Sequence, residues 1–438
     1  MNKSLYIVAF SLAFATTGIA QNNEGQDKVI DLGTQTTTEL RKTQAVSTIY
    51  SDELDKNATT SPYNAIYGLL PGLSVMQNTS WGTDKSRLNV RGRGSLNGDT
   101  PLFVVDGFAR PLEYINLSEI ESISVLKDGA ATALWGGRGA NGVVLITTKR
   151  GIYSQKDIKV DYKFGLGFPV NQPEFADAYT YAKARNEALR YDGLQPDMDE
   201  ASFLSGGNSD LYPNVDWQKE ALRNHTTSHQ LDITFRGGGK RLRYFSVLNY
   251  KNDMGLLNSK YTDYTDRYNS QMKKYFLNLR MNLDVDITDA TKLKLSMLGM
   301  LRETKRPTTS EATLFEQIFN TPSAAFPVQT LNGFWGSNNV LKTNPIANLA
   351  DVGYYKLNQR MLQADLRLVQ DLSVLTRGLS AELAIAYDNN ATYQETAKKS
   401  FMYQTIEKGT DGEPIYTNYG NPNDELEISN KGLANQYI

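Results

Sequence analysis

The sequence predicts an α+β domain followed by an antiparallel transmembrane β-barrel that is incomplete. Three observations predict this fold class. A glycine-rich stretch, residues 101–151, mixes short β-type runs with turn residues. After it, apolar and polar residues alternate in segments of about 9 to 12 residues, which is longer than most strands of soluble proteins and long enough to cross a bilayer at a tilt. The connections between these segments are alternately short and long, as in transmembrane barrels.

The first twenty residues, Met1–Ala20, are predicted to be a secretory signal peptide. Lys3 supplies the positive charge, Leu5–Ala15 the apolar centre, and Gly18–Ala20 a small-residue cleavage site. A single membrane-anchoring helix is the alternative, but the apolar run is too short to span a bilayer. No later segment has the roughly 18 consecutive apolar residues of a transmembrane helix, so a membrane location requires strands.

Composition narrows the classes of function. The 46 basic and 48 acidic residues nearly balance, which argues against a nucleic-acid partner. The chain has no cysteine, so disulfides, thiolate chemistry and a lipid-modified cysteine are excluded. Its 25 tyrosines suit sheets with rings at a membrane interface, although an ordinary all-β protein has them too.

Residues 21–58 form a polar segment rich in Thr and Gln, predicted to be extended or mobile in the periplasm. Within it, Lys28–Gly33 is a short island of β-favouring residues. Residues 59–151 are predicted to be one α+β domain. Its stretch Ser61–Asn78 has helical spacing and then breaks at Pro71–Gly72 into a short strand, and Leu102–Val105 and Val143–Thr148 are further strands.

The glycines of this domain match the dinucleotide-binding pattern G-x-G-x-x-G at Gly137, Gly139 and Gly142. That pattern needs a strand before it and a helix after it, so that the helix N-terminus holds the pyrophosphate. Here the order is inverted, because a helix-like segment precedes the glycines and a strand follows. We therefore predict turn-forming glycines with positive φ and no cofactor.

Residues 152–438 are predicted to form the partial barrel. Seven segments are predicted to be strands. Six of them alternate with a period of two, which places apolar residues on one face of a strand and polar residues on the other, and Leu242–Lys251 is a mixed case. The seven segments are Ile158–Phe168, Leu231–Arg236, Leu242–Lys251, Leu277–Thr288, Leu293–Met297, Leu362–Leu368 and Leu379–Tyr387. An eighth strand is predicted around Tyr393–Tyr403, whereas Gly420–Ile438 is polar and lacks a terminal aromatic strand.

The connections support a membrane barrel over a soluble sandwich. Short connections fall at residues 237–240, 289–290 and 371–376, and long ones at 169–228, 252–275 and 302–358. This strict alternation is typical of periplasmic turns and extracellular loops. The first long loop includes Glu174–Tyr191, which is predicted to be a helix.

The sequence offers no case for an enzyme or a metal site. His225 and His229 lead into a strand, where residues four apart lie about 13 Å from each other. An acidic group in the first long loop lacks the order of a calcium loop and is predicted to be a solvated surface. It consists of Asp192, Asp197, Asp199 and Glu200.

Several motifs resemble the SusC/RagA family of TonB-dependent outer-membrane receptors. They include VDG at 105–107, the long match at 122–149, RGRGS at 91–95, DLGTQ at 31–35 and YPNVDW at 212–217. The resemblance spans residues 28–257 and identifies the α+β domain as the family's plug. The plug-signature residues are Arg91, Gly92, Arg93, Gly94, Asp106, Gly107, Lys127, Asp128, Gly136, Gly139, Asn141 and Gly142.

The resemblance implies active import across the outer membrane, without a cofactor. Val29, Ile30, Asp31 and Leu32 occupy the place of the TonB box, a strand that pairs with periplasmic TonB by β-augmentation; an ordinary linker strand is the alternative. The family also implies a SusD-like surface lipoprotein as a lid, oligosaccharides or peptides as cargo, and contact with outer-membrane lipid.

Some alternatives stay open. Arg91 and Arg93 contact cargo or barrel wall, or else pair with carboxylates in a structural role, which we favour. Phe334 and Trp335 stack on sugars or pack the loops. For the whole chain, the alternatives to an importer are a non-transporting surface binding or adhesion module, a non-functional truncated remnant, and a siderophore receptor.

Geometry sets the size of the barrel that such a plug requires. A plug of about 90 residues needs a lumen wider than about 30 Å, and plugged lumens belong to barrels of about 22 strands. The seven or eight strands predicted here cannot close around such a plug. We therefore expect a truncated chain or the N-terminal portion of a longer receptor.

Overall fold

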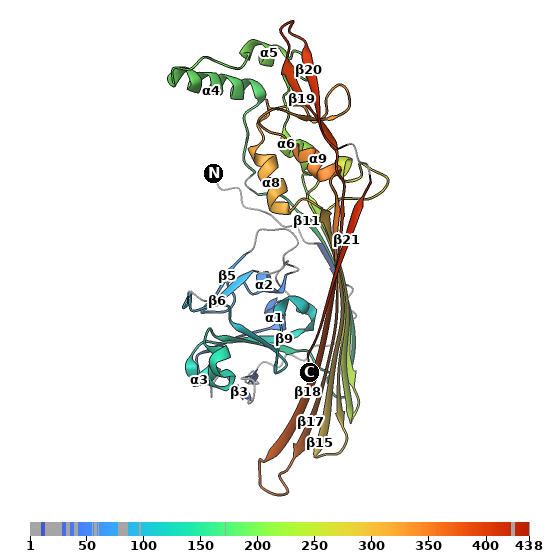
Figure 1. The fold of residues 1–438 in the computed structure, drawn as a ribbon. Coiled ribbons are helices and arrows are strands. Elements are labelled where there is room, and N and C mark those ends of the chain that lie inside the picture. The colour runs from blue at the N-terminus through green and yellow to red at the C-terminus, as the bar shows by residue number, and fades with distance from the viewer. Residues whose placement is uncertain are drawn as a thin grey trace.

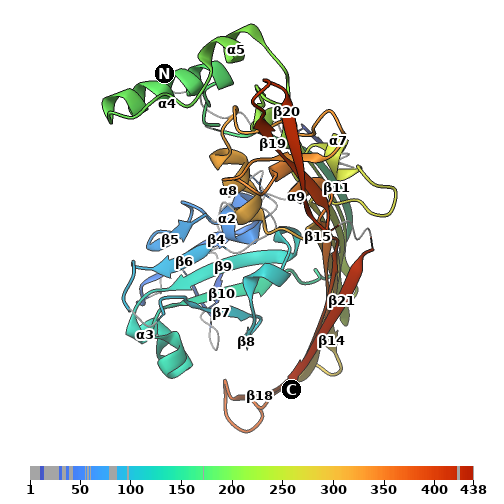
Figure 2. The ribbon, with the colours of Figure 1, turned by 45° about the horizontal axis from the view of Figure 1, so that its top comes forward.

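The computed structural model describes residues 10–13, 29–31, 36–38, 43–54, 56, 59, 61–77, 86–95, 98–170, 172–421 and 425–437. A small α+β domain, which we call the plug, lies beside one face of a tall antiparallel sheet, which we call the wall (Figure 1). Figure 2 shows that the wall curves around the plug. The wall is not closed into a barrel, and the predicted fold class is confirmed.

The plug is built on a five-stranded sheet in the order β4-β9-β10-β7-β8. These strands are β4 (Val46–Tyr50), β9 (Ile120–Leu126), β10 (Val143–Thr148), β7 (Leu102–Val105) and β8 (Phe108–Ala109). The central strand β10 is parallel to β7 and antiparallel to β9. Its first four residues are all buried, because both faces of the sheet are covered. The predicted bounds of β7 and β10 are confirmed.

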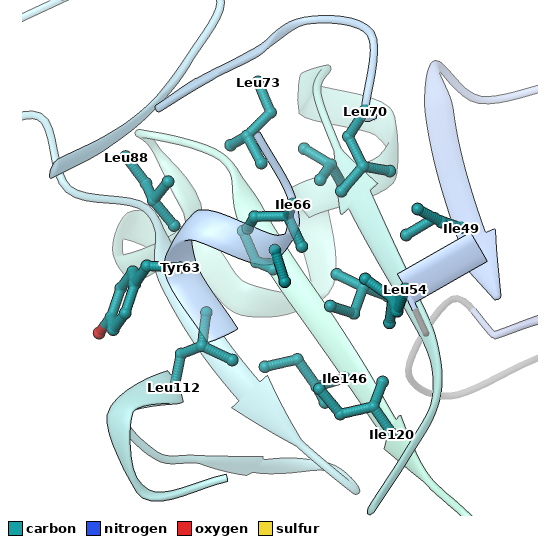
Figure 3. Packing of buried hydrophobic residues seen from close by; sticks show 14 of the residues in the cluster. Ile49, Leu54, Tyr63, Ile66, Leu70, Leu73, Leu88, Leu112, Ile120 and Ile146 are labelled. Atoms are coloured by element: carbon teal, nitrogen blue, oxygen red, sulfur yellow. The ribbon is translucent and has the colours of Figure 1, made fainter. Parts of the chain in front are cut away.

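One face of this sheet carries the main core of the plug. Leu54, Ile66 and Leu70 point from the chain above the sheet toward Ile120 and Ile146 on its strands (Figure 3). The chain there forms two short helices, α1 (Ser51–Leu54) and α2 (Pro62–Ala65). Pro62 opens α2 because the first helical position needs no N–H donor.

The sheet of the plug begins before residue 59. Strand β4 and helix α1 belong to the segment 21–58, for which the sequence predicts an extended or mobile conformation. The extended conformation is confirmed for residues 46–50, where β4 pairs with β9 along five residues, and the expectation is wrong for residues 51–54, which are helical. The domain boundaries themselves stay predictions.

The other elements of the plug are short. Strands β5 and β6 pair, as do β2 and β3. The bounds are β2 (Val29–Asp31), β3 (Thr36–Thr38), β5 (Leu73–Met76), β6 (Arg87–Val90), η1 (Leu112–Tyr114), η2 (Leu117–Glu119), α3 (Gly129–Thr132) and η3 (Ala133–Gly139).

The wall has nine strands in the order β1-β11-β12-β13-β14-β15-β17-β18-β21. All neighbours are antiparallel. The bounds are β1 (Phe10–Ala13), β11 (Lys156–Gly167), β12 (Thr226–Gly238), β13 (Leu242–Met254), β14 (Lys273–Asp286), β15 (Thr291–Pro307), β17 (Gly353–Asp371), β18 (Ser380–Lys398) and β21 (Glu427–Tyr437). Most of the predicted signal peptide lies outside the described residues.

The buried face of the wall is largely polar and its exposed face is apolar, which is the reverse of a sheet in a soluble protein. On β14, Asn278 and Arg280 are buried on the face toward the plug, whereas Leu277, Leu279 and Met281 are exposed on the other face. We call these the inward and outward faces. A sheet that exposes its leucines and buries its polar residues suits lipid on the outward side.

The alternation of connections is confirmed. Residues 239–241, 287–290 and 372–379 join strands at one end of the wall, and residues 168–225, 255–272, 308–352 and 399–426 join them at the other. We call the latter the long-loop end. The predicted eighth strand around Tyr393–Tyr403 is wrong. Most of those residues continue β18, and the eighth wall strand after the plug is β21, in the stretch that the sequence marks as polar.

The long loops fold into a cluster of helices around their own apolar core at the upper end of Figure 1. Their elements are α4 (Ala178–Tyr191), α5 (Glu200–Ser205), α6 (Trp217–Ala221), α7 (Ser259–Thr262), α8 (Glu311–Asn320), β16 (Trp335–Ser337), α9 (Pro345–Ala350), β19 (Met402–Lys408) and β20 (Pro414–Gly420). The described residues contain no helix both long and apolar enough to cross a membrane.

Candidate functional site

The candidate site is the interface between the plug and the inward face of the wall. At its centre, the guanidinium of Arg110, beside strand β8, donates hydrogen bonds to the carboxylates of Asp365 on β17 and Asp388 on β18, at 2.5 and 2.6 Å. Burial alone would lower the pKa of Arg110, but these two carboxylates outweigh it and raise that pKa. Arg110 therefore remains charged and joins the plug to two neighbouring strands.

A second ion pair lies deeper in the interface. Glu119, at the end of η2, is fully buried and accepts a hydrogen bond from Arg280 on β14 at 2.5 Å. Asn278 also donates to this carboxylate. Burial raises the pKa of Glu119, while Arg280 and Asn278 act against this shift. Two fully desolvated charges at this distance hold each other in place, since removing either leaves the other unpaired.

The other contacts across the interface include further polar ones and an apolar cluster, in which Tyr114 of η1 packs with Phe276, Leu298, Met300 and Met361 of the wall. Asn116 of the plug donates to Asp232 of β12 at 2.9 Å, and Arg150 pairs with Asp284 of β14 at 2.7 Å. Arg367 of β17 donates to the carbonyl of Asp106 at 2.8 Å. The plug therefore rests on the wall through hydrogen bonds, ion pairs and this small apolar cluster, while its main apolar core stays within the plug.

The structure places the predicted VDG motif at this interface. Asp106 has φ +47° and Gly107 has φ +92°, which makes a tight turn between β7 and β8. The carboxylate of Asp106 accepts hydrogen bonds from the backbone N–H and hydroxyl of Thr148, at 3.0 and 2.6 Å. These bonds fix the turn, and its carbonyl is thereby presented to Arg367.

The predicted residues Lys127 and Asp128 tie the N-terminal strand of the plug to its centre. Asp128 caps α3 by accepting from Ala131 N–H at 2.7 Å, and it also accepts from Ala45 N–H at 2.9 Å. These backbone donors favour the ionised carboxylate and lower the pKa of Asp128. Lys127 donates to the Ser47 hydroxyl at 2.6 Å. Both residues act within the plug, away from the wall.

The predicted glycine turn is confirmed in part. Helix-like η3 precedes it and strand β10 follows, so the inverted order holds. Gly136 and Gly142 have φ +53° and +90°. The expectation of positive φ is wrong for Gly137 and Gly139, which lie within η3. The side chain of Asn141 donates to the carbonyl of Gly98 at 3.2 Å.

Replacing Gly142 with alanine is expected to destabilise the plug. A Cβ there would lie 2.8 Å from the side chain of Val90, and positive φ alone costs an alanine about 1–3 kcal/mol. Urea unfolding of the full chain measures the loss. Gly137→Ala is the matched control, because a Cβ added at residue 137 would have no other atom within 4 Å. Equal unfolding midpoints for the two variants would contradict this role of Gly142.

The RGRGS motif lies on an exposed part of the plug. Arg91 and Gly92 have φ +56° and +86° and form a turn after β6. Arg93 lies 3.5 Å from the carboxylate of Asp99, which Arg87 also contacts at 2.7 Å. The pairing of Arg93 with a carboxylate agrees with the structural alternative for this residue. Gly94 is exposed.

The predicted TonB-binding strand is β2, which pairs with β3 through Val29, Ile30 and Asp31. Leu32 lies outside the described residues. Ile30 is almost fully buried and packs in a small apolar cluster on the second face of the plug sheet, with Leu126 and Val143 among its members. The strand is thus docked on the plug in this structure.

The long loops show where Trp335 and the acidic group of the first long loop lie. Trp335 is buried and donates to Asp351 at 3.1 Å, so it packs the loop core. The acidic group is engaged locally, since Asp197 pairs with Arg185 at 2.6 Å and Asp199 caps α5. Among the described residues, no three His, Cys, Asp or Glu side chains gather in a way that could hold a metal ion.

A groove of about 690 Å³ opens between the first long loop and α8. Phe175 lies on its rim and stacks on Phe319. Polar side chains, including Asn214 and Arg223, share the lining with Trp217. Asn214 and Trp217 belong to the YPNVDW motif, but the motif does not indicate the groove as a whole, because its other walls come from segments that are distant in the chain.

Comparison with known proteins agrees with this geometry. The family TonB-dependent Receptor Plug Domain matches residues 38–143. The TonB-dependent receptor SusC of Bacteroides thetaiotaomicron is 30% identical over 283 residues, which are 61% of this chain and 26% of SusC. The chain thus carries a TonB-dependent receptor plug domain and is similar in sequence to SusC, in agreement with the SusC/RagA resemblance of its motifs.

A second relative and a solved structure are also similar to this chain. TonB-dependent receptor P26 of Formosa agariphila is 28% identical over 281 residues, or 62% of this chain and 26% of that protein. The RagAB peptide importer in its closed-closed state shares the fold, with a TM-score of 0.65 at 19% identity over 81% of this chain and 42% of that one. The matches span about a quarter of the length of SusC and of P26.

Proposed function

We propose that this receptor imports oligosaccharides or peptides across the outer membrane, driven by TonB and assisted by a SusD-like surface lipoprotein. The observation that carries the proposal is the plug held on the inward face of the wall by polar contacts, including Arg110 with Asp365 and Glu119 with Arg280. A plug bound in this way would block the lumen of the barrel and would still be released when force is applied.

The proposal includes export by Met1–Ala20 and residence in the outer membrane, with the outward face of the wall in lipid. Energy would enter through residues 29–32, because an outer membrane has neither ATP nor an ion gradient. The strand β2 offers a backbone edge for β-augmentation by TonB. The long-loop end would face the cell surface and receive the cargo and the lid.

The groove beside α8 is a candidate first contact for cargo. An exposed phenylalanine next to amide and charged groups suits either a sugar ring or a peptide. RagAB, which shares the fold, is a peptide importer, and the groove itself favours neither class over the other. We therefore propose both classes and test them side by side.

The test locks the plug to the wall. Glu121 on β9 and Arg236 on β12 form a partly exposed ion pair at 3.3 Å, and the chain has no cysteine of its own. Cells that produce the receptor with Glu121→Cys and Arg236→Cys are treated with a cleavable thiol cross-linker, and uptake of labelled oligosaccharides and peptides is measured. We expect cross-linking to stop uptake and cleavage to restore it.

Each single-cysteine variant is the control, since it reacts with the reagent without joining plug and wall. Loss of the ion pair itself costs little because exposed pairs contribute about 0–1 kcal/mol. Unchanged uptake of both cargo classes in the cross-linked receptor would refute import through a displaced plug.

A further inference from the structure

The outward face of the wall carries a row of lysines near the long-loop end. Lys273 on β14 lies directly opposite Lys305 on β15, and Lys305 lies directly opposite Lys356 on β17. Their side chains share the outward face, because Lys356 is an even number of residues from the exposed Leu362 on the same strand. Like charges placed directly opposite one another destabilise a sheet unless an anion compensates them.

The carboxylates nearby compensate only part of this charge. Glu303 lies between two of the lysines, 3.4 Å from Lys305 and 3.1 Å from Lys356. Glu395 is opposite Lys356 and accepts a hydrogen bond from the hydroxyl of Tyr354. Within the described part of the chain, Lys273 has no carboxylate partner.

A fourth cation lies closer to the apolar band. Arg360 is exposed on the outward face, opposite Leu301 on β15 and Ala391 on β18. It lines a groove of about 610 Å³ with Asn358, Tyr393, Gly432 and Ala434. The small residues leave the guanidinium open to the side that lipid would occupy. In the described residues no acidic group pairs with Arg360.

The height of these cations on the wall is informative. From Arg360 toward the short connections, the outward face of β17 is apolar, with Leu362, Leu366 and Leu368 all exposed. Four residues from Arg360 in the other direction, the lysine row begins. The cations therefore straddle the upper edge of the apolar band, which is the level of lipid headgroups. An unpaired charge in contact with hydrocarbon is costly, so an anion is expected at this level.

We propose that Lys273, Lys305, Lys356 and Arg360 bind the phosphorylated headgroup of a lipid in the leaflet next to the long loops. We propose a lipid and not cargo as the ligand, because these residues lie on the outward face of the wall, away from the plug. Lysine ammonium groups serve as point charges for phosphate, and an arginine adds a planar, two-pronged donor. The inference rests on the membrane location proposed above and is independent of import.

The test is native mass spectrometry of the full chain in detergent, titrated with diphosphorylated lipid A. We compare it with a variant that combines Lys273→Gln, Lys305→Gln, Lys356→Gln and Arg360→Gln. We expect the variant to bind this lipid more than about tenfold more weakly, since each cation near a membrane surface adds to the attraction. Dephosphorylated lipid A is expected to bind the unchanged receptor as weakly as the variant binds the phosphorylated form.

Two controls separate charge from folding. Lys156→Gln removes a lysine from the other end of the outward face, on β11, and is expected to leave binding unchanged. A variant that combines Lys273→Arg, Lys305→Arg, Lys356→Arg and Arg360→Lys keeps the charge and is expected to keep binding. Equal binding by the glutamine variant, equal binding of dephosphorylated lipid, or full displacement by millimolar inorganic phosphate would overturn the lipid site. Because no transport is measured, such a result leaves import untouched.

Discussion

Deleting Val29–Leu32 is expected to abolish uptake while cargo binding at the cell surface stays unchanged. The deletion removes strand β2, the segment proposed to pair with TonB, and it does not touch the loops that would meet the cargo. Without that backbone edge no force reaches the plug. Uptake of labelled cargo by whole cells, with and without an inhibitor of the proton gradient, measures the first effect. Binding to de-energised cells measures the second.

Point substitutions separate pairing from packing in this strand. Ile30→Pro is expected to reproduce the deletion, because proline lacks the N–H that a β-ladder needs. Ile30→Ala removes the buried side chain from its apolar cluster on the plug and keeps the strand backbone. We expect it to lower plug stability and to retain uptake. If Ile30→Pro imports at the normal rate, the coupling role of β2 is wrong.

Replacing Arg110 with methionine is expected to loosen the plug from the wall by about 3–5 kcal/mol, the usual cost of removing one partner from a buried ion pair. The substitution leaves Asp365 unpaired in the interface. We expect a loss toward the lower end of this range, because the side chain of Asp388 is 27% exposed and so remains hydrated. Urea unfolding and limited proteolysis of the plug in the full receptor measure the change.

Two variants make this prediction specific. Arg138→Met removes an exposed arginine from the same domain and is expected to change stability little. Arg110→Met combined with Asp365→Asn and Asp388→Asn is expected to recover much of the loss, because neutral amides cost less to bury than unpaired carboxylates. If Arg110→Met unfolds like Arg138→Met, the ion pair does not hold the plug.

The strands of the wall could be predicted because lipid and plug impose opposite demands on alternate residues. On β14 every second residue from Leu277 to Val285 is apolar, so the period of two is visible in the sequence. Strand β21 has no such pattern, since Glu427–Tyr437 mixes polar residues on both faces. Its place depends on backbone pairing with β18, which leaves little trace in the choice of side chains.

The candidate site could be predicted only where its residues are local. The turn at Asp106–Gly107 is readable from the motif itself. The ion pair of Arg110 with Asp388 joins residues 278 positions apart, and a single sequence does not show such pairing. Strand β4 escapes prediction for a related reason. The residues Val46–Tyr50 favour a strand but lie in a polar segment, and only the contact with β9 makes them part of the sheet.

The largely polar character of the interface between plug and wall bears on whether the proposed displacement of the plug is reversible. When the plug moves, Asn116, Asp232 and Arg280 exchange protein partners for water, and each of them is well hydrated in bulk solvent. The apolar surface that is uncovered is small, because the main apolar core stays inside the plug and the apolar cluster at the interface takes Tyr114 from the plug. The displaced state therefore has little tendency to aggregate, and in the import proposed above the same contacts re-form after each cycle.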